Sequence, residues 1–203
     1  MRTSIPLLLL FWLFAAGVSA QTDSLTPAGQ LSLGVRSSWG LVYEHNWNRI
    51  SFGSGGQLRL RFSDKVNSDW FFDFLQGDLD DIGRRTDLHI GWSILYYPLN
   101  KNGFVQPYIV AGHCFEFLTM SENGNPDNAA SRKSASIQAG AGVHLYIAPR
   151  TDLSFMTQYM MHFGTNIDVV QTDPVIFEKP GGIALQDHIL LNFSINYIIA
   201  DLW

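Results

Sequence analysis

The stretch 188–203 alternates apolar and polar residues in steps of two. Its apolar members share one parity and polar residues fall between them: Phe193, Ile195, Tyr197, Ile199 and Trp203 against Asn192, Ser194 and Asn196. A period of two is that of a β-strand with one apolar and one polar face, whereas a helix repeats every 3.6 residues. The apolar face of such a strand has to be covered by a protein core or by lipid.

The same alternation recurs in eight segments: 30–37, 56–62, 68–75, 86–97, 105–118, 134–147, 151–163 and 188–203. Several are long enough to cross a bilayer when tilted, which takes about 9–11 residues. The connections 63–67, 98–103 and 148–150 are short, whereas 39–55, 76–85, 119–133 and 164–187 are longer. Short turns on one rim and long loops on the other are typical of outer-membrane barrels. We therefore expect an all-β fold, an eight-stranded antiparallel up-and-down transmembrane β-barrel over 30–203.

The N-terminus has the pattern of a secretory signal peptide. Arg2 supplies positive charge, residues 5–16 are apolar, and Val18-Ser19-Ala20 is a small-x-small cleavage site. The alternative is a membrane anchor, but the apolar run is shorter than the roughly 20 residues that span a bilayer. We expect a signal peptide over 1–20 and a short periplasmic leader over 21–29.

Composition narrows the class of protein further. Charged residues make up 15% of the chain, against about 25% in a typical soluble domain, and aromatic residues reach 13%. The net charge of -5 argues against a nucleic-acid partner, since phosphates are bound by clusters of Lys and Arg. A single cysteine, Cys114, excludes an internal disulfide.

The polar parity of the strands predicts a charged interior. If the apolar parity faces lipid, these residues face inward: Arg36, Arg59, Arg61, Asp69, Asp73, Asp87 and Glu116. Buried charges must pair, and these signs nearly balance. An eight-stranded barrel is just wide enough to be filled by side chains, so we expect a plugged lumen. The alternative is a secreted soluble β-barrel binding protein with the parities reversed; low charge and the many aromatic residues favour the membrane.

Three stretches carry a family resemblance: QPYIVAG at 106–112, QAGAGV at 138–143 and PRTDLS at 149–154. They resemble small outer-membrane β-barrels, above all the Bacteroidetes-type barrels called PorT-like. The resemblance implies a place in the bacterial outer membrane and contact with its lipid. An aromatic C-terminal residue, here Trp203, is similar to the ending that the barrel assembly machinery reads in such proteins. The family resemblance implies little about activity, because one fold hosts many functions.

One enzymatic likeness needs weighing. The letters HFGTN, beginning at His162, are similar to the His-aromatic-Ser-Asn element of outer-membrane lipid A deacylases, which use a Ser nucleophile, a His base and a carboxylate. Gly164 stands where the Ser should be, and Thr165 is one position off, on the other face of a strand. Asp168 and Asp187 are only nominal carboxylates. We expect no catalytic residues and keep a lipid A deacylase-like hydrolase as the alternative function.

Metal and cofactor chemistry has little support in the sequence. The histidines are scattered: His45, His89, His113, His144, His162 and His188. A metal site needs three or four convergent ligands, and although His89, His144 and His188 share the inner parity, their depths in the barrel are not given by sequence. We expect hydrogen bonding in the lumen, no metal site and no cofactor.

The segment 39–55 is the most distinctive of the long connections. It holds Trp39, Tyr43, Trp47 and Arg49, and aromatics with Arg are typical of binding hot spots. The alternative is a girdle at the membrane interface, where Trp and Tyr are also enriched. We expect a non-enzymatic barrel that binds or scaffolds a protein or surface ligand through its extracellular loops, in secretion or in the envelope.

Overall fold

The computed structural model describes residues 28–44, 47–79, 82–99, 104–170, 172, 174–179, 182 and 184–203. For 42–44 and 47–49 the description is limited to the backbone. The predicted signal peptide 1–20 and residues 21–27 of the predicted leader lie outside the described residues.

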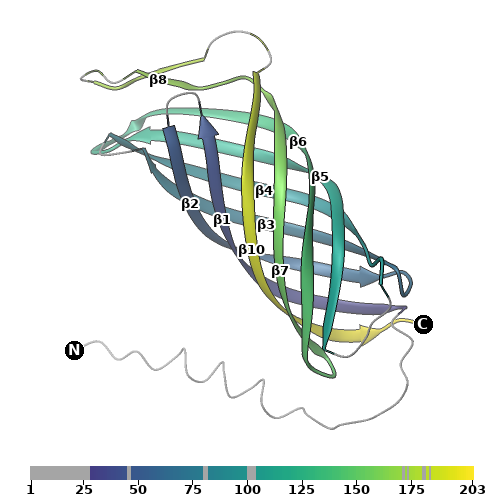
Figure 1. Ribbon diagram of the computed structural model, residues 1–203. Helices are drawn as coiled ribbons and strands as arrows, with labels where there is room; N and C mark the ends of the chain where they lie inside the picture. Colours follow the sequence, from purple (N-terminus) through teal and green to yellow (C-terminus); the bar gives the residue numbers. More distant parts are fainter. Residues whose placement is uncertain are drawn as a thin grey trace, which may run out of the picture.

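Eight strands close into an antiparallel barrel, as predicted (Figure 1). Their ring order is β1-β10-β7-β6-β5-β4-β3-β2. The bounds are β1 Gln30–Glu44, β2 Trp47–Arg61, β3 Val66–Leu79, β4 Gly83–Tyr96, β5 Val105–Glu122, β6 Asn125–Ala148, β7 Thr151–Gly164 and β10 Ala184–Asp201. Two short strands, β8 Asp168–Val170 and β9 Ile176–Glu178, pair as a separate hairpin between β7 and β10.

The strands are longer than the sequence predicted. The expected loops 39–55, 76–85 and 119–133 are wrong, because the ladders β1–β2, β3–β4 and β5–β6 continue through most of each. β5 ends at Glu122 and β6 begins at Asn125; Asn123 and Gly124 join them, and Gly124 has a φ of 80°. At 76–85 and 119–133 the sequence pattern failed because a strand that leaves the apolar band no longer alternates, although its backbone pairing persists. Over 39–55 the outward side chains Trp39, Ile50 and Phe52 stay apolar, so the alternation there was overlooked. The β7–β10 connection is long, as predicted, and it carries β8 and β9.

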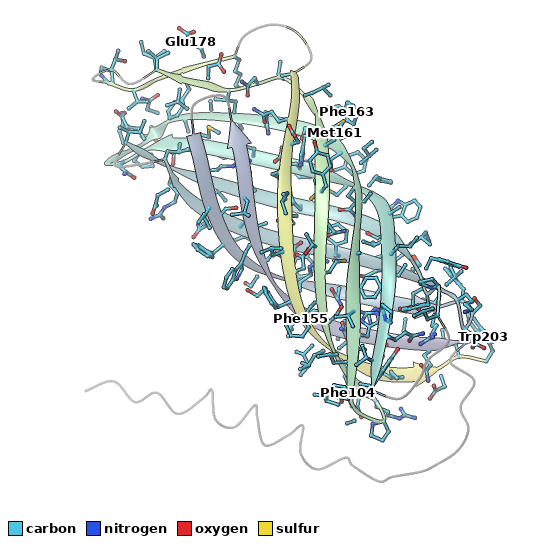
Figure 2. The ribbon with its side chains drawn as sticks, viewed as in Figure 1. Phe104, Phe155, Met161, Phe163, Glu178 and Trp203 are labelled. Carbon is cyan, nitrogen blue, oxygen red and sulfur yellow. The ribbon has the colours of Figure 1, made fainter. Side chains whose placement is uncertain are left out.

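The barrel wall is apolar on its outside (Figure 2). Large exposed side chains cover it, among them Leu33, Val35, Leu58, Trp70, Phe72, Phe74, Ile90, Trp92, Ile109, Phe115, Ile137, Phe155, Phe163, Phe193, Ile195, Tyr197 and Ile199. An outward apolar band and a polar interior are the arrangement of a transmembrane barrel and the reverse of a soluble one. Among the described residues, no helix is long and apolar enough to cross a membrane.

The two ends of the barrel differ. At one, which we call the turn end, lie the short β2–β3 and β6–β7 turns and Trp203. There the backbone N–H of Leu202 donates to the carbonyl of Gly29 at 2.9 Å. Gly29 has a φ of 85°, and a Cβ on it would meet the backbone of Trp203, so this approach requires glycine. The opposite end carries β8 and β9, and we call it the hairpin end (Figure 1).

Candidate functional site

Side chains fill the lumen in three apolar layers separated by polar groups. The turn-end layer holds Leu95, Tyr97, Tyr108, Val110 and Met156. The middle layer holds Phe71, Leu75, Cys114, Met160 and Leu190. The hairpin-end layer holds Leu79, Leu118, Met120, Ala130 and Ile167. Such a filling leaves the barrel plugged rather than porous, as expected for eight strands.

A buried ion pair spans β2 on the inner wall of the barrel. Nε of Arg36 on β1 lies 2.9 Å from Oδ1 of Asp73 on β3, and both side chains are fully buried. The guanidinium also lies over the ring of Phe71, 4.5 Å from its centroid. Gly55 on the intervening strand leaves room, because a Cβ there would lie about 2.5 Å from Asp73 Oδ1. The pair thus occupies a place that the backbone keeps free of other side chains.

A second network lies toward the turn end. Nη1 of Arg59 donates to both carboxylate oxygens of Asp152 at 3.2 Å. Asn196 donates to the same carboxylate at 2.9 Å, and Nδ1 of His144 lies 3.4 Å from it.

Arg61, two residues further along β2, extends the same network. It donates to the backbone carbonyls of Ser63 and Asp64 and to the side-chain oxygens of Tyr146 and Gln106, at distances of 3.0 to 3.5 Å. This network ties β2 to β5, β6, β7 and β10 through hydrogen bonds.

A third network, which we call the Glu116 cluster, lies on the hairpin-end side of the bore. Glu116 is fully buried and accepts from Ser134 at 2.8 Å and from Arg132 at 3.0 Å. Arg85 lies 3.5 Å from its other oxygen and 2.8 Å from Asp87. Two cations and two carboxylates therefore balance within the cluster.

Three histidines border the Glu116 cluster from separate strands. His89 is on β4, His162 on β7 and His188 on β10, and all three are buried. The ring centroids of His162 and His188 are 4.5 Å apart, and those of His89 and His188 are 5.5 Å apart. Glu116 lies 3.4 Å from His162 Nδ1 and 3.6 Å from His89 Nε2.

The structure places every sequence-predicted lumen residue in the interior. Arg36, Arg59, Arg61, Asp69, Asp73, Asp87 and Glu116 are all buried. It does not bring them together as one network, because six of them divide among the three groups above, and Asp69 lies opposite Arg59 in the β2–β3 register. Sequence reasoning missed Arg85, Arg132 and Asp152, which supply the partners of Asp87, Glu116 and Arg59. For Arg85 and Arg132 the missed signal was inward parity on strands that continue past the apolar alternation, whereas Asp152 shares the inner parity of the predicted segment 151–163.

The residues of the hydrolase alternative do not form a catalytic arrangement. Ser134 and Glu116 both face the same nitrogen of His162, whereas a triad needs the nucleophile and the carboxylate on opposite ring nitrogens. Asp187 accepts from the hydroxyl of Tyr159 on the outer wall at 2.6 Å. Asp168, the other nominal carboxylate, accepts from Asn166 at 2.6 Å.

The residues predicted for loop binding lie in strands. Trp39 is part of β1 and is exposed on the outer wall, where its ring packs 5.6 Å from the rings of Phe52 and Phe193. The backbones of Tyr43, Trp47 and Arg49 belong to the hairpin-end part of the β1–β2 ladder. The prediction of a loop over 39–55 was therefore wrong, because backbone pairing carries both strands to Glu44 and Trp47.

Hydrogen bonds lock the β8–β9 segment onto the β5–β6 hairpin. Glu122 accepts from the backbone N–H of Val175 at 2.9 Å and from Asn128 at 2.8 Å. Asn128 in turn donates to the carbonyl of Val175 at 2.7 Å. These bonds hold the pKa of Glu122, which lies beyond the apolar band, below its usual value. Val169 and Phe177, one on each short strand, pack against the hairpin-end layer and cover the bore.

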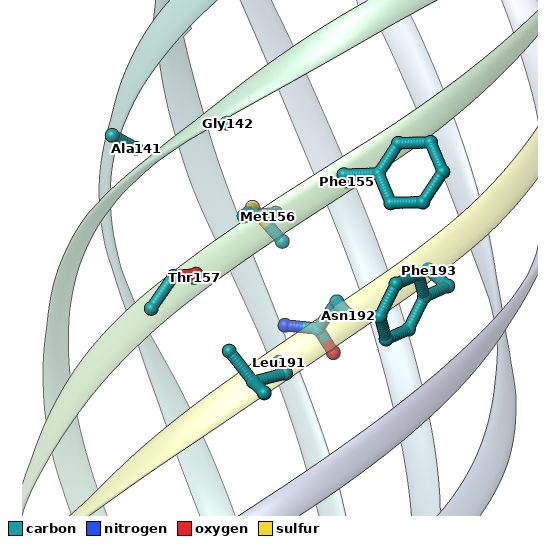
Figure 3. A pocket seen from close by; sticks show the side chains of 8 residues that line it. All are labelled: Ala141, Gly142, Phe155, Met156, Thr157, Leu191, Asn192 and Phe193. Carbon is teal, nitrogen blue, oxygen red and sulfur yellow. The ribbon is translucent and has the colours of Figure 1, made fainter.

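A hollow of about 360 Å³ lies in the outer wall over β6, β7 and β10 (Figure 3). Ala141 and Gly142 form its small side, and the rings of Phe155 and Phe193, 5.3 Å apart, form another. It faces the exposed apolar band rather than the lumen, so it belongs to the surface that lipid would cover.

Comparison with solved structures supports the fold. Neisserial surface protein A is 12% identical, with a TM-score of 0.64 over 83% of this chain and 97% of that one. A major outer membrane protein of Thermus thermophilus is 13% identical, with a TM-score of 0.54 over 82% and 98%. Ail, the attachment invasion locus protein of Yersinia pestis, in complex with the heparin analogue sucrose octasulfate, is 15% identical, with a TM-score of 0.52 over 84% and 99%.

No curated protein sequence matches the chain. The family model described as "outer membrane protein beta-barrel domain" matches residues 7–174, which is most of the chain. The match agrees with the closed ring of strands and the outward apolar band, and it places the protein in the bacterial outer membrane. The chain belongs to the outer membrane protein beta-barrel domain family.

Proposed function

We propose that this protein is a closed, non-enzymatic outer-membrane barrel that binds a protein partner at its hairpin end. The observation that carries the proposal is the locked β8–β9 segment. Its inner side chains Val169 and Phe177 pack on the barrel, while Val170 and Ile176 on the outer face are exposed. A small apolar surface on a rigid support loses little conformational freedom on binding.

Charge at this end favours a protein over a polyanion. Among the described residues there, the exposed acidic side chains Asp78, Asp127, Asp168 and Glu178 accompany the basic Arg84, Lys133 and Lys179. A heparin analogue is bound in the Ail complex, but this mixed surface lacks the basic excess that a polyanion needs. Val170 and Ile176, flanked by Asp168 and Glu178, suit a partner that offers apolar and basic groups.

The other contacts of the proposal rest on the barrel itself. The backbones of Tyr43, Trp47 and Arg49 reach the hairpin end, so these residues stay candidate contacts beside the β8–β9 segment. The proposal includes insertion by the barrel assembly machinery. An open sheet would leave unpaired backbone groups in lipid, so the strands need assistance to close as they enter the membrane. Membership of the PorT-like group, with a role in secretion or the envelope, stays a prediction from resemblance.

A photo-crosslinking amino acid at position 176, in cells that produce the protein, tests the binding surface. We expect one protein adduct, lost when Val170→Glu and Asp168→Lys are introduced and retained in the control Asp127→Asn at the β5–β6 tip. Heat-modifiable gel mobility checks that each variant still folds. Only lipid adducts at position 176, or an adduct that is unchanged by both substitutions, would contradict the proposal.

A further inference from the structure

His89, His162 and His188 converge inside the barrel in a way that hydrogen bonding does not explain. Each offers one ring nitrogen, and the three nitrogens lie within 4.8 Å of one another. The residues are only 1%, 1% and 4% exposed. Three imidazoles in contact in a closed space are the donor set of a transition-metal site.

The ring nitrogens also lack other partners. Among the described residues, both ring nitrogens of His89 and Nε2 of both His162 and His188 are buried without a hydrogen bond. Unpaired buried polar atoms are costly, so a native structure that retains four of them in one cluster calls for an explanation such as a bound ion. Stacking of the rings does not satisfy these nitrogens.

Glu116 supplies the outer partner that metal-binding histidines usually have. Its oxygens lie 3.4 Å from Nδ1 of His162 and 3.6 Å from Nε2 of His89. A carboxylate on one ring nitrogen fixes the tautomer and leaves the other nitrogen to bind the metal. Arg132 and Ser134 hold Glu116 in place, so it acts through the histidines rather than as a ligand.

We propose that His89, His162 and His188 bind one divalent transition-metal ion in the lumen. Zinc–nitrogen bonds of about 2.0–2.1 Å place three nitrogens roughly 3.3 Å apart, so the widest pair has to close by roughly 1.5 Å through side-chain rotation. Imidazole donors suit Zn(II), Cu(II) and Ni(II), whereas Mg(II) and Ca(II) take oxygen ligands. The fourth position is open to water or a small anion.

The ligands come from two opposite sides of the bore. β10 pairs directly with β7, whereas β4 lies opposite β10 in the ring order, with β6 and β5 between β7 and β4. A metal held by all three strands fixes the bore across its width. Because ligand binding to the folded state alone stabilises it, metal should raise resistance to denaturant.

The test is metal binding by the full barrel folded in detergent with Zn(II) present, so that slow entry into the lumen does not matter. After removal of free metal, we expect one zinc per protein by elemental analysis. Folding with Co(II) should give the visible absorption of a nitrogen-bound, low-symmetry cobalt ion. The unfolding midpoint in urea should be higher with zinc than with a chelator present.

His162→Gln and His188→Gln should each reduce bound zinc to less than about a tenth, because two imidazoles are too few for a stable site. His144→Gln, in the buried turn-end network, and His113→Gln, on the outer wall, are the matched controls and should retain it. If a ligand variant fails to fold, the cobalt spectrum and the zinc-dependent midpoint of the unsubstituted protein still decide. Zinc below about a tenth of one ion per unsubstituted protein overturns the proposal. So does a zinc content in both ligand variants as high as in the unsubstituted protein.

Discussion

Replacing Arg36 with leucine leaves Asp73 as a buried carboxylate without its counter-ion. Both side chains are fully buried, and their closest atoms are 2.9 Å apart. Breaking a buried pair from one side costs about 3–5 kcal/mol, since the remaining charge stays desolvated. With a urea slope of about 2 kcal/mol per M, a loss of about 4 kcal/mol lowers the unfolding midpoint by about 2 M.

The double variant Arg36→Leu with Asp73→Leu separates charge from packing. Removing both charges often leaves stability unchanged or raises it by about 1–4 kcal/mol, so the double variant should be more stable than either single one. Arg150→Leu is the matched control, because its pair with Asp201, 3.1 Å apart, is partly exposed. Surface pairs contribute about 0–1 kcal/mol, so this variant should barely move the midpoint.

Urea unfolding of the barrel in detergent, followed by tryptophan fluorescence, measures the unsubstituted protein and all of these variants. If Arg36→Leu lowers the midpoint no more than Arg150→Leu does, lumen water must solvate Asp73, and the reasoning from a dry interior fails. If the double variant loses the sum of the two single losses, side-chain packing rather than charge accounts for the effect.

Three further outcomes follow from the structure. In planar bilayers the protein should show no large steady conductance, because three side-chain layers fill the bore; stable porin-like steps would refute this. Gly140→Val should lower the free energy of unfolding by about 1–3 kcal/mol, because its Cβ would strike the carbonyl of Thr157; an unchanged urea midpoint would contradict it. The pKa of Glu122 is lowered in the folded state, so at pH values above the ordinary glutamate pKa its carboxylate should keep the hydrogen bond from the Val175 N–H. As the pH falls through the lowered pKa, the carboxylate is protonated and this hydrogen bond should weaken. Glu122→Gln should weaken the same hydrogen bond at neutral pH. Hydrogen exchange at Val175 measures this, and exchange that does not depend on pH beyond its intrinsic chemistry would count against it.

The side on which a residue lies could be predicted from sequence, but its partner could not. Parity assigns Arg59 to the interior because a strand turns its side chains to alternate faces. Its partner Asp152 is 93 residues away on a strand across the bore. That match depends on strand tilt and stagger, which are properties of the closed barrel rather than of any segment.

The histidines illustrate the same limit. Parity places His89, His144 and His188 inward, yet His144 lies beside Asp152 in the turn-end network while His162 joins the other two. Depth along the barrel separates them, and depth follows from the register between strands. The strand ends were missed for another reason: Arg85 and Arg132 lie where outward residues are no longer apolar, so the pattern stops before the strand does.

The seam of the barrel joins β1 to β10, the first and last of its eight strands. Ser38 and Asn192 meet across it through a hydrogen bond of 2.7 Å, although they are 154 positions apart in the chain. Contacts between such distant positions form slowly, because a long loop of chain must close before they gain anything. Until β10 is in place, β1 keeps an open edge, so the rate of closure at this seam should limit how fast the protein matures and how long it needs protection from aggregation.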